Sequence, residues 1–497
     1  MTDTDRSLIF SRFGLGARPG DLAAITGDPK AALVAEIADP TSLFLADANL
    51  PSTADAYTQV REFQRARQAQ RDQANASAGA SGSTPNTAGS MTMGADPMAG
   101  ANGGMTATIA SVPPTRSPPL SPADAPTTPN PNTLMDAEVA ARIDRVLAAP
   151  IGFGERLVTF WANHFAVQAA ADEVVRGLAG AFEREAIRPF VLGKFADMVL
   201  AVTQHPAMLL SLNNATSIGP NSKQGLKNDK GLNENHAREL MELHTVGVDA
   251  GYTQADVTSF AKVLTGWSFG RGENEPEIYG RFVFRAAAHE PGPQTVMGKT
   301  YPQSGVDQGM AVIADLAKGA ATARHLATQF VTYFVADKPD PGLVGQLADT
   351  FRKTGGDLKA MTLALVGSAE AWAARAQKLR TPQEFVWSAA RALQLEIKPN
   401  VVNRALADLG EPLWNPPSPQ GYKDDAATWL APDAMITRVD IAELLASQDK
   451  SLGDVTRLAT DIFGDALSPD TATAIARAES RQQAVALLLM SPEFQRR

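Results

Sequence analysis

The chain has 497 residues, of which 44% are hydrophobic, enough to bury one large core or two moderate ones. Its formal net charge of −9 argues against nucleic-acid binding, which favours a basic face. The absence of cysteine excludes disulfides, thiolate metal sites and cysteine nucleophiles, so any metal ion would need histidine and carboxylate ligands.

The N-terminal segment, residues 1–74, is expected to form helices that pack on a larger domain. Residues 7–45 show short helical patterns, and residues 54–74 form a polar stretch rich in Arg and Gln. The apolar run Ser7–Phe13 is too short for the core of a signal peptide. No apolar run approaches the roughly 20 residues that span a bilayer. The sequence as written therefore predicts a cytoplasmic protein without a transmembrane segment.

Residues 75–132 differ sharply in composition from the rest of the chain. They consist almost entirely of Ala, Ser, Gly, Thr, Pro, Asn and Met, with very few large apolar side chains. Such a stretch buries too little apolar surface to offset the entropy lost on ordering. We therefore predict a disordered insertion here.

The remaining residues, 133–497, show mostly helical periodicity, so the predicted fold class is mainly α, a multi-helical globular domain. One excursion into β-structure is expected at about 280–301. The alternating run Gly280–Ala286 predicts a strand, and Thr295–Tyr301 is expected to pair with it as a hairpin. His289 and Glu290 would then lie in the turn between the two strands, exposed unless the hairpin folds over the helices.

Two histidines precede the most polar helix. His164 lies on the same helical stripe as Leu157, Phe160 and Trp161, so its side chain is predicted to face inward. His205 follows a predicted helix and stands directly before Pro206, where capping of a helix terminus is the expected role.

The stretch Asn233–Gly247 concentrates ionisable groups in one predicted amphipathic helix. Glu239 lies beside its apolar stripe, and a buried carboxylate there requires a metal ion or another cation as partner. Arg238 and Glu242 are four residues apart, which predicts an ion pair along the helix. His244 comes just before the glycine that ends the pattern.

These residues suggest a site for acid–base or metal chemistry. His164, Glu239 and His244, together with His205, are candidate ligands of a divalent metal ion. Glu242 is the candidate general base, and Arg238 would orient it or bind an anionic substrate. The spacing matches neither of the usual zinc and di-iron motifs, so a buried polar network remains the alternative.

A haem-binding, peroxidase-like protein is a lesser alternative. The sequences around His164 and His244 faintly resemble the distal and proximal histidine segments of plant-type peroxidases. Those enzymes carry an arginine one helical turn before the distal histidine, where this chain has Phe160. The chain also lacks a Gly-X-Ser-X-Gly elbow, a Walker-type phosphate loop and a clear dinucleotide fingerprint.

Five stretches together resemble the bacterial domain of unknown function 1800 family, whose members have no assigned activity. The longest reads Asn-Glu-Asn-His-Ala-Arg-Glu-Leu-Met-Glu-Leu-His-Thr-Val-Gly, and the resemblance extends over nearly the whole chain outside 75–132. The stretches are Trp161–Phe165, His205–Met208, Asn233–Gly247, Leu264–Trp267 and Pro416–Trp429.

The resemblance implies a second class of function. Many similar proteins carry export signals and are encoded beside a sulfatase-like family, which implies a periplasmic or exported role and a sulfatase-like partner protein. His236 stands where such proteins commonly have Tyr, and Tyr422 where they often have Trp. Two hypotheses follow: a helical, metal-dependent enzyme, or a non-catalytic assembly or export factor of the cell envelope.

Overall fold

The computed structural model describes residues 3–45, 49–80, 129–228, 231–272, 274–373, 378–450 and 453–497. Most of these residues lie in helices, and their strands form two short antiparallel pairs, so the predicted mainly α fold is confirmed. The disordered insertion is predicted over residues 75–132, of which 81–128 lie outside the described residues and 131–132 begin a helix. Residues 75–80 instead continue a helix.

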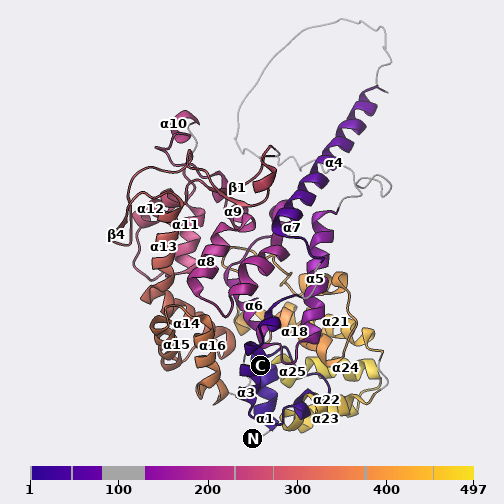
Figure 1. Cartoon of the computed structure of the whole chain (residues 1–497). Coiled ribbons are helices and arrows are strands. Elements are labelled where there is room, and N and C mark those ends of the chain that lie inside the picture. Colours follow the sequence, from indigo (N-terminus) through magenta and orange to yellow (C-terminus); the bar gives the residue numbers. More distant parts are fainter. Residues whose placement is uncertain are drawn as a thin grey trace, which may run out of the picture.

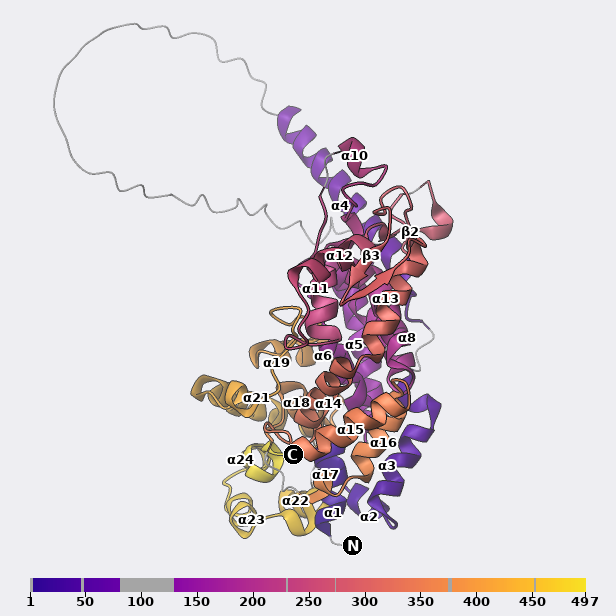
Figure 2. The same ribbon diagram turned by 90° about the vertical axis from the view of Figure 1, so that its left-hand side faces the viewer.

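The N-terminal segment is helical, as predicted, and its polar helix is the longest of this part. The elements are α1 (Asp3–Leu8), η1 (Ile9–Phe13), α2 (Asp21–Ala24), α3 (Pro29–Ala38), η2 (Pro40–Leu43) and α4 (Thr53–Ala80). The outer part of α4 projects away from the body of the molecule (Figures 1 and 2).

The middle of the chain supplies the central helices and all four strands of the described residues. It comprises α5 (Pro131–Ala148), α6 (Phe153–His164), α7 (Glu173–Phe182), η4 (Glu183–Ile187), η5 (Arg188–Phe190), α8 (Phe195–Gln204), α9 (Pro206–Ser211), η6 (Asn214–Thr216), α10 (Gly225–Asn228), α11 (Asn235–Glu239), η7 (Leu240–His244), α12 (Gln254–Leu264), β1 (Trp267–Phe269), η8 (Pro276–Ile278), β2 (Phe282–Phe284), β3 (Gln294–Val296) and β4 (Lys299–Tyr301).

The C-terminal part is helical throughout its described residues. It comprises α13 (Val306–Lys318), α14 (Ala320–Phe334), α15 (Pro341–Lys353), α16 (Leu358–Gly367), α17 (Glu370–Ala373), α18 (Pro382–Ala392), α19 (Pro399–Asp408), α20 (Ala426–Trp429), α21 (Pro432–Gln448), α22 (Val455–Phe463), η9 (Gly464–Ala466), α23 (Pro469–Ala476), α24 (Arg481–Met490) and α25 (Pro492–Gln495).

Capping residues define where several of these helices begin. Asn130, Thr253 and Thr381 each accept hydrogen bonds from backbone N–H groups of the first turn of α5, α12 and α18, and the third residue of each helix bonds back. This reciprocal arrangement satisfies donors that a helix cannot satisfy by itself. The cap at Thr381 also fixes the position of Glu384, a residue of the site described below.

One hydrophobic cluster extends from Ile9 in η1 to Phe494 in α25, so the N-terminal helices share a core with the rest of the molecule. The helices α5 to α7 run through the middle of the molecule. On one side of them lie α11 to α16, and on the other lie α18 to α25 (Figure 1). The first and last helices lie close together at the lower end in both views (Figures 1 and 2).

The pairing of the strands differs from the prediction. Residues 280–286 do not pair with 295–301; β2 pairs with β1, and β3 pairs with β4. The predicted single hairpin is wrong because Gly266, with φ +79°, turns the chain after α12 and starts β1 alongside β2. His289 and Glu290 do not lie in a turn of one hairpin, and both side chains are buried.

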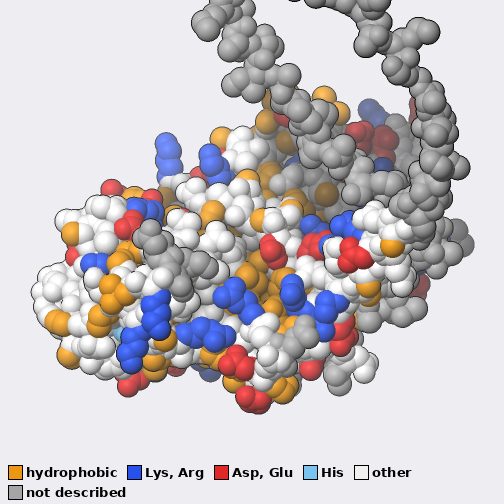
Figure 3. Space-filling view, turned by 90° about the horizontal axis from the view of Figure 1, so that it is seen from above, with side chains coloured by type: hydrophobic (Ala, Val, Ile, Leu, Met, Phe, Trp, Pro, Cys, Tyr) orange, Lys and Arg blue, Asp and Glu red, His pale blue; other side chains and the backbone are white. Residues whose placement is uncertain are grey.

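The end of the molecule that carries α10 and the outer part of α4 is seen from above in Figure 3. Lys and Arg side chains gather across the middle of this face, with Asp and Glu beside them.

Candidate active site

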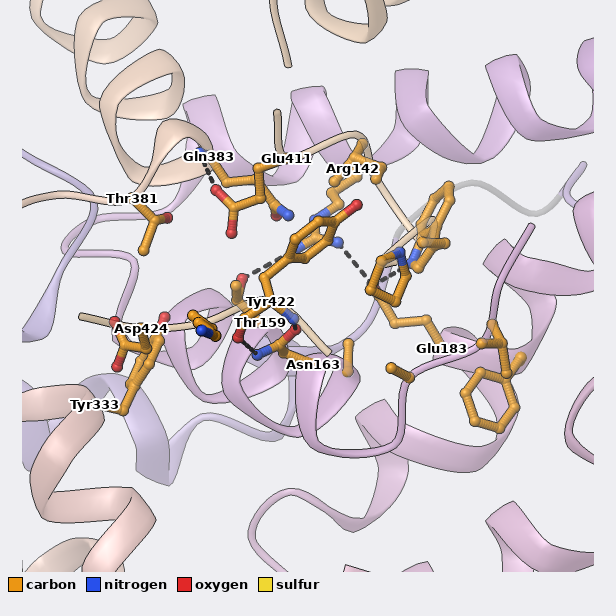
Figure 4. Close-up of a pocket in the computed structure, with 18 residues that line it drawn as sticks. Arg142, Thr159, Asn163, Glu183, Tyr333, Thr381, Gln383, Glu411, Tyr422 and Asp424 are labelled. Carbon is orange, nitrogen blue, oxygen red and sulfur yellow. Dashed lines mark hydrogen bonds and ion pairs between the residues drawn. The ribbon is translucent and has the colours of Figure 1, made fainter. Parts of the chain in front are cut away.

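A two-lobed cleft runs along the C-terminal half of α6. One lobe lies between α6, the start of α18 and the loop 411–424. The other lies between α6, α14 and η7. We call the two lobes together the central cleft, because five residues line both of them: Asn163, Tyr333, Tyr422, Lys423 and Asp424. Figure 4 shows the first lobe.

The loop 411–424 is fastened to α6 by side-chain and backbone hydrogen bonds. Asn163 accepts a hydrogen bond from the N–H of Tyr422 (2.7 Å) and donates one to its carbonyl oxygen (2.9 Å). Gly421 has φ +80°, and a Cβ at this position would lie 2.4 Å from the carbonyl oxygen of Asn163. Only glycine permits this close approach, which holds Tyr422 in the cleft.

Glu183 closes one end of the first lobe as part of a buried ion-pair network. Its carboxylate lies 2.7 Å from both Arg142 and Arg188, and it accepts a hydrogen bond from the indole of Trp414 (2.9 Å). Burial opposes its ionisation, but Arg142 and Arg188 outweigh burial and lower its pKa. Glu183 is therefore an ionised anchor whose oxygens are already engaged.

Asp424 lies at the opposite end of this lobe, beside Tyr333 (Figure 4). Its Oδ1 is 3.2 Å from Nζ of Lys378 and 3.4 Å from Nη2 of Arg497. Its buried Oδ2 has no hydrogen-bond partner among the described residues. Burial raises the pKa of Asp424 to about 7, although the two cations oppose this change. Near neutral pH the side chain therefore exchanges readily between its acid and its base form.

Glu411 is a second carboxyl group in the same lobe. Its Oε2 accepts a hydrogen bond from the backbone N–H of Gln383 at 2.7 Å. Burial raises the pKa of Glu411 to about 8, and the negative charge of Glu384 adds to this effect. At pH 7 Glu411 is thus mostly protonated and can act as a hydrogen-bond and proton donor.

Tyr333 lies where the two lobes meet. Its ring is stacked between the guanidinium groups of Arg156 and Arg497, whose central carbons are 4.8 and 5.0 Å from the ring centre. Both arginines are paired at 2.6 Å with the buried carboxylate of Glu384. The hydroxyl of Tyr333 has no hydrogen-bond partner among the described residues. The two cations thus fix the ring, and its buried hydroxyl is left without a hydrogen bond from the described part of the chain.

His164 lies at the second lobe and faces inward, as predicted. Its Nδ1 is 3.0 Å from Oε1 of Gln329, and its Nε2 is 3.1 Å from the carbonyl oxygen of His244. Burial lowers its pKa to about 3, and His325 adds to this effect. A neutral imidazole donates only once, so both contacts are satisfied if the amide of Gln329 is turned to donate to Nδ1.

The predicted metal ligands are only partly brought together. The rings of His164 and His244 have centroids 5.8 Å apart. Nε2 of His205 instead lies 2.8 Å from the hydroxyl oxygen of Thr53, within hydrogen-bond distance. Its Nδ1 accepts a hydrogen bond from the N–H of Ala207 at the start of α9, so the predicted capping role is confirmed. Within the described ranges, no three His, Asp or Glu side chains converge as a metal ion requires.

The predicted ion pair between Arg238 and Glu242 is replaced by another. Arg238 lies 3.1 Å from Glu234 and 3.0 Å from Gln254. The reason lies in the helix, which widens into the π-helical turn η7 at Leu240 and so changes the spacing that an i,i+4 pair requires. Glu242 lines the second lobe and not the first.

Glu239 is half-buried, and its pKa is raised by burial and by the neighbouring Glu242. No lysine, arginine or histidine of the described residues forms an ion pair with Glu239. None of these side chains therefore supplies the cation predicted beside its carboxylate. His236 is fully buried, and neither of its ring nitrogens has a partner among the described residues.

Sequence reasoning missed three residues at the centre of the cleft: Tyr333, Glu411 and Asp424. The available signal was weak. Glu411 opens a Pro-rich loop that contains aromatic residues, and Asp424 closes it, in the segment Pro416–Trp429 that carries the family resemblance. A carboxyl group at each end of a loop with buried aromatics was the pattern that could have identified them.

The fold and the cleft together define a helical protein with a polar cleft built around carboxyl groups and tyrosines. The chain belongs to the family described as "Protein of unknown function (DUF1800)", whose model matches residues 8–496. The predicted resemblance is therefore confirmed. No curated protein and no solved structure matches the chain. No helix of the described residues is long and apolar enough to cross a membrane.

Proposed function

We propose that this protein is a hydrolase that cleaves a C–O bond in the central cleft by general acid–base catalysis. The observation that carries the proposal is the pair of carboxyl groups in the first lobe, Glu411 and Asp424, whose pKa values of about 8 and about 7 lie near neutral pH. Catalytic acids and bases work best when their pKa values lie near the working pH.

The two carboxyl groups take complementary roles. Asp424, in its ionised form, removes a proton from a water molecule, which attacks the carbon of the substrate. Glu411, in its protonated form, gives its proton to the departing oxygen as the C–O bond breaks. Asp424 has then gained one proton and Glu411 has lost one, and exchange with solvent restores both. The hydroxyl of Tyr333, which has no partner among the described residues, would bind the substrate beside Asp424.

The proposal is tested with pairs of glycosides and esters that differ only in their leaving group. A nitrophenyl group leaves without protonation, whereas an alkyl alcohol needs an acid. We expect Glu411→Gln to slow hydrolysis of the alkyl substrates by about 10²–10⁴-fold and that of the nitrophenyl substrates far less. Asp424→Asn should slow hydrolysis of both the alkyl and the nitrophenyl substrates. Glu173→Gln, which alters a partly exposed ion pair with Arg67 outside the cleft, is the control.

The pH dependence supplies a second criterion. Activity should rise with the ionisation of Asp424 near pH 7 and fall with that of Glu411 near pH 8, which gives a narrow maximum between them. Absence of hydrolysis across the panel, or full activity of Glu411→Gln on the alkyl substrates, would contradict the proposal.

A metal-dependent enzyme is the second candidate. The observation that favours it is His244, which is buried and has no partner for either ring nitrogen among the described residues, 5.8 Å from His164 in ring-centroid distance. Metal analysis of protein purified without a polyhistidine tag, followed by His244→Phe, tests it. A stoichiometric ion that is lost in the variant would support this candidate. The envelope role with a sulfatase-like partner stays a prediction.

A further inference from the structure

A second pocket lies at the lower end of the molecule, where the first and last helices meet (Figure 1). Its walls come from α1, η1, α17, α22, η9 and α25, and its empty space, mouth included, is about 1510 Å³. The wall residues that matter here are Leu8, Phe10, Trp372, Phe463 and Phe494. We call it the basal pocket. It shares no lining residue with the central cleft.

Arg380 and Arg438 are both buried arginines without an ion pair to a carboxylate of the described residues, and of these two only Arg380 lines the basal pocket. Arg156, Arg188 and Arg497 each lie 2.6 Å from a carboxylate oxygen. Arg380 is only 3% exposed and lines the basal pocket, yet it forms no ion pair with a carboxylate of the described residues. A buried cation without a counter-ion is costly, because its hydration is lost and nothing replaces it.

The hydrogen bonds of Arg380 leave part of its guanidinium unused. Its Nη1 donates to the carbonyl oxygen of Phe494, and the guanidinium stacks on the ring of that residue, 5.0 Å from its centre. Nε and Nη2 have no partner within the described part of the chain. Burial lowers the pKa of Arg380 to about 9, which still leaves it charged at pH 7.

The nearest carboxylates are already committed. Glu384 acts on Arg380 through its charge, but its oxygens are held by Arg156 and Arg497. Glu493, which also lines the basal pocket, accepts hydrogen bonds from Ser468 and Thr471. Asp465 also lines the pocket, at an exposed position, and forms no ion pair with Arg380 among the described residues. Arg380 thus lacks a carboxylate partner within the described ranges, and Arg496 adds a second positive charge at the same wall.

We propose that the basal pocket binds a single-chain amphiphile, whose anionic head group meets Arg380 and whose hydrocarbon tail packs on Phe10, Trp372 and Phe463. A carboxylate or phosphate matches the planar donor fork of the guanidinium. The aromatic walls provide the apolar surface for the tail. This binding site is independent of the hydrolase proposed for the central cleft.

The experiment is titration calorimetry of the full chain with decanoate, decyl phosphate, decanol and acetate. We expect decanoate or decyl phosphate to bind at least roughly tenfold more tightly than decanol, which lacks the charge, and acetate, which lacks the tail, not to bind measurably. The anion that binds with the higher affinity identifies the preferred head group. Equal binding of decanol and decanoate, or no binding of either anion, would overturn the proposal.

Variants locate the site. Arg380→Gln should weaken binding of the preferred anion roughly tenfold or more, and should leave the unliganded protein at least as stable, because an unpaired buried charge is removed. Ala466→Trp fills the pocket from a partly exposed wall position without changing any charge, and should abolish binding even if Arg380→Gln fails to fold. Arg404→Gln, an 81% exposed arginine elsewhere, is the control and should bind normally. Unchanged binding in Ala466→Trp would contradict the assignment.

Discussion

Glu411→Gln should change the stability of the protein in a strongly pH-dependent way. Glutamine matches the shape of the protonated carboxyl group, and its oxygen can keep the hydrogen bond from the N–H of Gln383. The folded pKa of about 8 lies above the ordinary value of 4.5, so the folded state holds this proton more tightly than the unfolded state does. The wild-type protein therefore loses stability as the pH rises from about 4.5 to about 8, and the variant does not.

The magnitude follows from the size of the shift. Each pKa unit corresponds to about 1.4 kcal/mol, so a shift from 4.5 to about 8 corresponds to about 5 kcal/mol as an upper limit. We expect the variant to be nearly as stable as the wild type at pH 5 and more stable by a few kcal/mol at pH 9. Urea unfolding followed by circular dichroism at several pH values measures this difference.

Glu384→Gln is the matched control, because Glu384 is equally buried but paired with Arg156 and Arg497. Removal of one partner from a buried ion pair costs about 3–5 kcal/mol, so this variant should be less stable than wild type at both pH values. A stability difference between wild type and Glu411→Gln that stays constant from pH 5 to pH 9 would refute the reasoning.

Three further predictions concern the histidines and the loop. His236→Phe should raise the free energy of unfolding by about 1–3 kcal/mol at pH 7, because it removes two buried ring nitrogens without partners; unchanged or lower stability in urea would contradict this. The pKa values of His164, His205 and His236 are lowered to about 3 by burial, so the unfolded state binds more protons below pH 6.5. Each of these histidines should then reduce stability by about 1.4 kcal/mol per pH unit as the pH falls from 6.5. Melting temperatures recorded at several acidic pH values measure this loss, and His236→Phe should make the loss of stability per pH unit smaller. Gly421→Ala should displace the loop 411–424, because its Cβ would lie 2.4 Å from a carbonyl oxygen at φ +80°; we expect a loss of about 1–3 kcal/mol, seen in thermal unfolding, whereas Gly345→Ala, with open space around its Cβ, should lose none.

Local patterns in the sequence predicted the helices well, because helical periodicity and capping residues act over a few neighbouring positions. The inward side chain of His164 and the capping role of His205 followed from such patterns. The pairing of the strands did not, because residues 267–269 are too short a run to predict a strand and gain a partner only through the turn at Gly266. Strand pairing depends on tertiary context more than helix formation does.

The candidate site was harder to predict, because burial, and not the spacing of residues in the sequence, raises the pKa values of its carboxyl groups. Glu242 and His164 line the second lobe and were found from the helices that carry them. Glu411 and Asp424 owe their raised pKa values to the packing of a loop against α6 and α18, which no single stretch of sequence encodes. The ion pair expected for Arg238 failed for a related reason, since the π-helical turn at Leu240 alters the spacing.

The ionisation of the two central carboxyl groups tests the proposed function most directly, and it requires no substrate. Protein labelled with ¹³C at the carboxyl carbons of Asp and Glu is titrated by NMR, and Asp424→Asn and Glu411→Gln assign the two signals. The account predicts midpoints near pH 7 for Asp424 and near pH 8 for Glu411. Midpoints of both groups below pH 5 would show two permanently ionised carboxylates and would contradict the acid–base site.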